Sequence, residues 1–209
     1  FPFIDWAIFC WLPMSQAHKR KNPYLSATYG QFMLFKRLAY EQIGGHSRVK
    51  DNAVDDMELG RMTKREGLVW SLLDGGGLVT SLPYENNVDA LKGISRSVFP
   101  ALNYHVSLLV AFSILLLAIA YIPPYNFISE VISDQFSTGF FYLSLFSLSM
   151  LVISWAFVCV RFKHPKYLVI LFPVSITLVV LVAYYSMFAN AMQFQSWKDR
   201  GVPGRRVRL

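Results

Sequence analysis

The sequence has few charged residues and only two cysteines. Of its 209 residues, 16% are charged and 54% are hydrophobic, whereas soluble domains contain about 25% charged residues. Cys10 and Cys159 lie in apolar surroundings without a partner at a disulfide or metal-binding spacing. The composition therefore indicates a membrane protein and argues against a disulfide-stabilised scaffold or a cysteine-based metal site.

The few charges are distributed unevenly along the chain. Most lie before residue 100, and between Val106 and Val160 only Glu130 and Asp134 are charged. The sequence thus predicts a polar part and an apolar part. The net charge of +7 is compatible with nucleic-acid binding, but Lys and Arg beside membrane spans set topology and attract anionic lipid. We therefore expect a membrane partner and no nucleic acid.

Three apolar segments are each long enough to cross a bilayer: residues 104–122, 140–160 and 167–189. They define a transmembrane region at 103–190, followed by a basic tail at 191–209. Pro123-Pro124 is predicted to close the first segment, and Pro173 to kink the third. The spans contain no Asp, Glu, Lys or Arg, which argues against a channel or transporter with a charged pathway.

The loops between these segments do not give a consistent topology. The positive loop 161–166 should be cytoplasmic, and the loop 123–138, without Lys or Arg, should lie outside. Three complete crossings would then place the basic tail outside. Either the tail breaks the positive-inside rule or one segment is re-entrant.

The polar part predicts a mixed α/β fold. Strands are expected at 29–36, 68–73 and 78–82, the last two around a glycine-rich turn. Helices are expected at 37–43, stopped by Gly44-Gly45, and at 55–66, ended by Gly67. Residues 3–14 and 86–101 are expected to form interfacial helices; a buried core helix is the alternative for 3–14.

An acid pair begins the predicted helix at residue 55. Asp55 with Glu58 fits a variant of the capping box, and acidic residues in a first turn suit the helix dipole. This explanation leaves Asp56 free. A carboxylate at the end of a helix can point away from it and accept a proton from a hydroxyl group.

Three sequence blocks carry a family resemblance: GQFMLFKRLAYEQIGGH (30–46), VDDMELGRMTKREG (54–67) and ALKGISRSVFPAL (90–102). Their order and spacing resemble the C-terminal half of membrane-bound family 2 glycosyltransferases, in the branch that acts on carotenoid, hopanoid and sphingolipid acceptors. The resemblance implies a partial GT-A-like domain at 1–102, on the cytoplasmic face of a prokaryotic plasma membrane. It implies inverting transfer from a nucleotide sugar to a lipid or polyisoprenoid hydroxyl.

The resemblance also assigns roles around the acid pair. Asp56 matches the general base of the family's Glu-Asp motif, and Asp55 supports it in place of the Glu. Gly30 and Gln31 match a loop at the acceptor pocket. His46 matches a Gly-Gly-His element on the acceptor side. A simple turn glycine and a hydrogen-bonded loop histidine are the alternatives for Gly30 and His46.

The donor side is represented more weakly. Arg96 matches the Arg of the family's Gln-x-x-Arg-Trp motif, which binds the donor diphosphate, and Lys92 could share that role. Gly93 and Ser97 replace the Gln and the Trp, so a solvated or lipid-facing arginine is the alternative.

The family's Asp-x-Asp motif does not occur in the sequence. The resemblance implies a divalent metal, Mg or Mn, whose ligands are not in this chain. A donor-binding half would then precede the chain or belong to a separate subunit. The rival interpretation is a non-catalytic membrane assembly or transport subunit with a degenerate transferase half.

Overall fold

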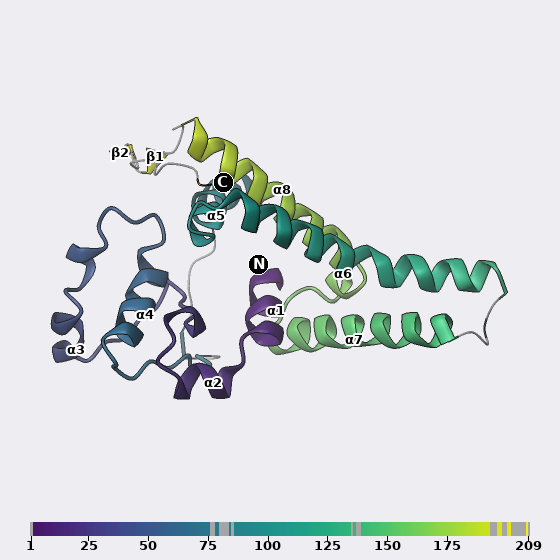
Figure 1. Cartoon of the computed structure of the whole chain (residues 1–209), viewed down its shortest axis with the longest axis horizontal. Helices are drawn as coiled ribbons and strands as arrows, with labels where there is room; N and C mark the ends of the chain where they lie inside the picture. The colour runs from purple at the N-terminus through teal and green to yellow at the C-terminus, as the bar shows by residue number, and fades with distance from the viewer. Residues whose placement is uncertain are drawn as a thin grey trace. The chain divides into compact units, whose positions relative to one another are not determined.

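A computed structural model describes residues 2–75, 78–79, 84, 86–134, 136, 139–192, 196–197, 200–201 and 208. In this part of the chain the structure is all-α (Figure 1). The helices are α1 (Pro2–Trp11), α2 (Met14–Lys19), α3 (Arg37–Gln42), α4 (Asp55–Arg65), α5 (Asn87–Ala101), α6 (Val106–Ile132), α7 (Gly139–Arg161) and α8 (Phe172–Ala191), with short 3-10 turns η1 (Pro23–Leu25), η2 (His46–Arg48) and η3 (Lys166–Val169).

The predicted α/β fold was wrong. Strand structure among the described residues is limited to the two-residue antiparallel pair β1 (Ser196–Trp197) and β2 (Arg200–Gly201). Residues 32–36 and 68–75 have no regular structure, and of the expected strand 78–82 only residues 78 and 79 are described. A strand needs a neighbour for its backbone hydrogen bonds, and apolar, aromatic-rich composition does not supply one.

The predicted helix ends in the polar part were confirmed. Gly44 and Gly45, with φ of 80° and 56°, follow α3, and Gly67, with φ of 71°, follows α4. Glycine takes this left-handed conformation without the steric cost of a Cβ. After α4 the amide of Leu68 returns to the carbonyl of Thr63 at 3.0 Å, which closes the last turn of the helix.

Contacts divide the chain into two units. The first contains residues 1–10 and 106–184. Its core joins one face of α1 to the apolar helices: the Trp6 indole stacks on Trp155 at 5.5 Å and donates to Ser154 Oγ at 2.9 Å. Phe9 also stacks on Phe157, with ring centroids 4.6 Å apart, although half of it is exposed. The helix α1 is therefore packed against α7 through Trp6 and Phe9.

The second unit contains residues 11–105 and 185–209. Its small core is formed by Ile43, Val49, Leu59 and Met62. Beside it Lys64, only 2% exposed, donates from Nζ to carbonyl oxygens at the end of α2, those of Ala17 and Arg20. Carbonyls at a helix C-terminus have no partner within the helix, so this lysine ties α2 to α4.

Three helices are long and apolar enough to cross a membrane: α6, α7 and α8. In Figure 1, α6 and α7 run side by side as a hairpin. The helix α6 continues through Pro123-Pro124 to Ile132, so the prediction that these prolines end it was wrong. Pro173 is the second residue of α8 rather than a kink inside it. Proline is compatible with a first helical turn, whose amides lack helical acceptors.

Both ends of this apolar region belong to the second unit. The amide of Phe99, in α5, donates to Ser186 Oγ in α8 at 3.1 Å, and the amide of Arg208 donates to the Tyr104 carbonyl at 2.8 Å. The chain thus leaves this unit at Val106 and returns to it at residue 185. If the whole second unit lies on one side of a membrane, the chain from Val106 to residue 184 must cross that membrane an even number of times. Residues 185–191 of this unit are also the end of α8, itself a candidate span, so both alternatives for the basic tail stay predictions.

Candidate functional site

The site is built around the first turn of α4. The N-cap residue is Val54, and no side chain caps the helix. Asp55 is therefore the first helical residue, and its Oδ1 accepts from the Asp56 amide at 3.0 Å. Glu58 faces Arg61 and Arg65 instead. The capping-box assignment of Asp55 and Glu58 was wrong, because the helix begins one residue earlier than that motif requires, and Asp55 is its first residue instead of its N-cap.

Asp56 is half-buried at this helix end. Its Oδ1 accepts from the Met57 amide at 2.7 Å, and the backbone of Gly30 also hydrogen-bonds to it. Burial raises the pKa of this carboxyl above the usual 3.8, and the charge of Asp55 raises it further, against the opposing effect of the backbone hydrogen bonds. A carboxylate with a raised pKa is a stronger proton acceptor than an exposed one.

Gly30 lies directly against this carboxylate. It is in a turn closed by a bond from the Phe32 amide to the Tyr29 carbonyl at 3.1 Å. Its φ is not positive, so the turn itself does not require glycine. A Cβ at this position would be 2.9 Å from Asp56 Oδ2. Glycine is therefore required at position 30 because this residue approaches Asp56 closely. The next residue, Gln31, is exposed.

Arg96, in α5, interacts electrostatically with Asp55 of the acid pair. Burial lowers the pKa of its guanidinium, whereas the charges of Tyr84 and Asp55 raise it. Arg96 is half-buried, which differs from the solvated alternative. A guanidinium that interacts with one carboxylate, that of Asp55, can balance its charge or attract an anionic group such as a diphosphate.

Tyr84 is a site residue that sequence reasoning missed. Its ring covers Gly93, where an added Cβ would be only 2.6 Å from Tyr84 Cζ. This packing gives a physical reason for glycine at position 93. A glycine inside a helix lowers the stability of the helix. Gly93, inside the predicted helix 86–101, was therefore the sequence signal for a close neighbour at this position.

His46 and Lys92 have other surroundings. The amide of His46 donates to Tyr40 Oη at 2.9 Å, and its Nδ1 lies 2.6 Å from the same oxygen. This matches the alternative of a hydrogen-bonded loop histidine. Lys92 is exposed, and its carbonyl accepts from Ser95 Oγ at 3.0 Å. The contacts described for these two residues do not include Asp56.

The expected divalent metal was tested against the side chains present. Among the described residues, no group of three or more His, Cys, Asp or Glu side chains could hold a metal ion. Asp55 and Asp56 supply two carboxylates, and one of the Asp55 oxygens already accepts a backbone amide. These residues do not fit a metal site.

Comparison of the chain with protein-family models, with curated proteins and with solved structures gave no match. The function of the chain is therefore inferred from the chemistry of the residues around Asp56 and from the apolar helices.

Proposed function

We propose that this chain is the acceptor-binding, membrane-embedded part of an inverting glycosyltransferase. The donor is a nucleotide sugar, and the acceptor is the hydroxyl group of a lipid or polyisoprenoid. The single observation that carries the proposal is Asp56: a half-buried carboxylate with a raised pKa, packed so closely against Gly30 that a Cβ there would be 2.9 Å from its Oδ2. The chain continues from this site into helices suited to a membrane.

In the proposed reaction Asp56 accepts the proton of the acceptor hydroxyl. The oxygen attacks the anomeric carbon of the sugar, and the bond from that carbon to the diphosphate breaks, with inversion of configuration. Gly30, which has no Cβ, allows the chain to approach Asp56 closely, and the acceptor would contact the neighbouring exposed Gln31. The negative charge that develops on the leaving diphosphate would be balanced by Arg96, with help from Lys92.

The charge of Asp55 has a defined part in this proposal. It raises the pKa of Asp56, which increases the affinity of Asp56 for the proton. The same carboxylate interacts with Arg96: burial lowers the pKa of the guanidinium and the charge of Asp55 opposes this effect. Asp55 is thus a positioning and tuning residue rather than the base.

The location of the site suits a lipid substrate. The loop 161–166 is positive, which under the positive-inside rule supports a cytoplasmic side for this loop, and we propose the same side for the site. A prokaryotic plasma membrane is the proposed setting. The sugar nucleotide would bind to an N-terminal half or to a separate donor-binding subunit, which would also supply any Mg or Mn ligands. No step of the proposed mechanism is assigned to a metal held by this chain.

The test is an acceptor assay with the Asp56→Asn variant. Membranes that contain the protein, together with its donor-binding part, are incubated with isotopically labelled nucleotide sugars and a lipid extract of the source cells. The labelled glycolipids are then measured by mass spectrometry. Loss of a general base should lower the initial rate by about 100-fold to 10,000-fold. The matched control is Glu41→Gln, an exposed carboxylate on α3, which should transfer at the wild-type rate.

Transfer by Asp56→Asn near the wild-type rate would overturn the assignment of the base. Absence of labelled lipid with wild-type protein, for every nucleotide sugar offered, would favour the rival interpretation. In that case the chain would be a non-catalytic assembly or transport subunit.

A further inference from the structure

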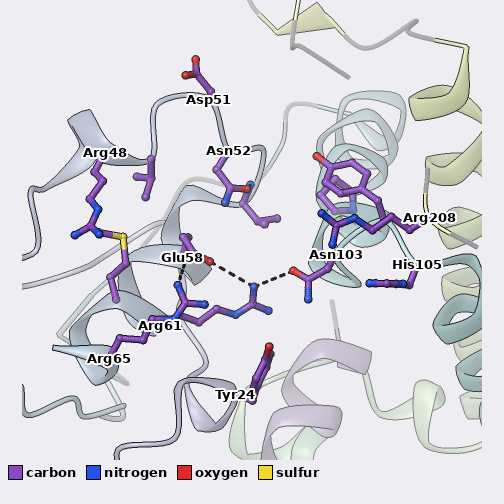
Figure 2. Close-up of a pocket in the computed structure, with 15 residues that line it drawn as sticks. Tyr24, Arg48, Asp51, Asn52, Glu58, Arg61, Arg65, Asn103, His105 and Arg208 are labelled. Carbon is purple, nitrogen blue, oxygen red and sulfur yellow. Dashed lines mark hydrogen bonds and ion pairs between the residues drawn. The ribbon is translucent and has the colours of Figure 1, made fainter. Parts of the chain in front are cut away.

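A basic cavity lies in the second unit, on one side of α4 (Figure 2). Its volume is about 760 Å³, within the range of sites that hold small ligands. Glu58, Arg61 and Arg65 of α4 line it. Nine residues, about two and a half helical turns, separate Asp56 from Arg65, so their side chains project in opposite directions. This cavity is therefore distinct from the proposed catalytic site.

The cavity has an excess of positive charge. Four arginines line it, Arg48, Arg61, Arg65 and Arg208, against the two carboxylates of Asp51 and Glu58; Arg48 also pairs with Glu66 at 3.8 Å. Glu58 is shared by two of the arginines: its Oε1 lies 2.6 Å from Arg65 and its Oε2 lies 3.6 Å from Arg61. One carboxylate cannot balance two guanidinium groups. An anionic ligand would complete the balance.

Arg61 is fixed in place before any ligand binds. It is only 8% exposed, and its Nη1 donates to Asn103 Oδ1 at 3.3 Å. Its guanidinium lies over the Tyr24 ring, 5.8 Å from the centroid. Figure 2 shows it extended between Glu58 and Asn103. A buried arginine held on several sides keeps its fork of donors in one orientation, which suits recognition of a phosphate.

The opposite wall is a strained turn. Asn103 and Tyr104 are consecutive residues with positive φ, 52° and 64°, a conformation rare outside glycine. Tyr104 is buried against Phe99, with ring centroids 5.8 Å apart. The Arg208 amide bonds to the Tyr104 carbonyl at 2.8 Å. The strained turn thus brings a distant arginine to the wall of the cavity, and strain of this kind concentrates at binding sites.

We propose that this cavity binds a phosphate-bearing ligand through Arg61, Arg65 and Arg208. Phosphate accepts the paired donors of guanidinium groups and supplies the missing negative charge. The ligand is either a soluble phosphate compound or the phosphate headgroup of a lipid. The inference does not depend on the proposed glycosyl transfer, because it concerns a different face of α4.

The test is direct binding to the full chain in nanodiscs. Inorganic pyrophosphate is titrated into protein in phosphatidylcholine nanodiscs, with calorimetric detection. In a second arm, phosphatidic acid is introduced into the nanodiscs and its retention on the purified protein is measured by mass spectrometry. Binding of pyrophosphate identifies a soluble ligand, and selective retention of phosphatidic acid alone identifies a lipid headgroup. Either result supports the proposal.

The variants separate this site from general attraction by a basic protein. Arg65→Gln and Arg208→Gln should each weaken binding at least tenfold, because each removes one set of paired donors. Arg37→Gln is the matched control, since this arginine is exposed on α3 and pairs only locally with Glu41; its affinity should be unchanged. Glu58→Gln should bind severalfold more tightly, because it releases two guanidinium groups to the ligand.

Two results would overturn the proposal. One is the absence of binding in both arms by a protein that remains folded by circular dichroism. The other is binding that Arg65→Gln, Arg208→Gln and Arg37→Gln all weaken equally. Neither result bears on transfer by Asp56, which is measured by a separate assay.

Discussion

Replacing Gly30 by alanine tests the contact at the centre of the site. The added Cβ would be 2.9 Å from Asp56 Oδ2, where ordinary contacts begin near 3.4 Å. The carboxylate must then move by about half an ångström to restore normal packing. Because φ at Gly30 is not positive, the backbone itself accepts alanine. Any effect therefore comes from the contact with Asp56.

The magnitude follows from the cost of overpacking. Forcing an extra carbon into a filled space costs about 1–3 kcal/mol, which lowers Tm by about 3–10 °C for a chain of this size. If Asp56 is the proposed base, its displacement from the productive position should lower the rate by about tenfold to 100-fold. Gly30→Ala should therefore reduce both stability and transfer.

The assay is thermal unfolding in nanodiscs, followed by circular dichroism, together with the transfer assay. Gly75→Ala is the matched control, because the nearest atom to its Cβ would be Val79 Cγ2 at 3.5 Å, an ordinary contact. In an Asp56→Ala background the obstructing oxygen is gone. There Gly30→Ala should cost nothing or stabilise by about 0.4–1 kcal/mol, by restricting the unfolded chain. An equal loss of stability in both backgrounds would refute the proposed contact.

Two further predictions concern the second unit and the membrane topology. Lys64→Ala should destabilise the protein by about 2–4 kcal/mol in thermal unfolding, because it leaves two carbonyls at the end of α2 without their donor. The control is Lys19→Ala, at an exposed lysine. A similar loss of stability in both variants would contradict the proposed link between α2 and α4. A reporter at the C-terminus and a tag inserted beside Asp51 should be accessible from the same side of the membrane, and accessibility from opposite sides would rule out an even number of crossings.

The sequence predicted the helices better than the fold. Helix ends at Gly44-Gly45 and Gly67 follow from the conformational freedom of glycine, a local property that the sequence shows directly. The apolar helices follow from length and composition. The prediction of a sheet was wrong because the pairing of a strand depends on a partner that is distant in the sequence. Composition at residues 29–36 carries no information about that partner.

The candidate site could be predicted only in part, because its contacts join residues that are distant in the sequence. Asp56 and Gly30 belong to separate sequence blocks, and the family resemblance named both. Their contact could not be derived from either block alone. Tyr84 was missed because its role is to cover Gly93, which depends on how the chain enters α5. The basic cavity was missed entirely, because the tertiary structure brings Arg208 beside Arg61.

The most direct test of the central claim is the pH dependence of transfer in Asp55→Asn. Ionised Asp56 is the proposed base, so kcat/KM should fall as the pH drops through its raised pKa. The charge of Asp55 contributes to that raised pKa, and Asn keeps an oxygen for the Asp56 amide. The variant should therefore remain active, and the acid limb of its profile should move to lower pH. Loss of transfer, or an acid limb that stays in place or moves to higher pH, would contradict the assignment of Asp56 as the base.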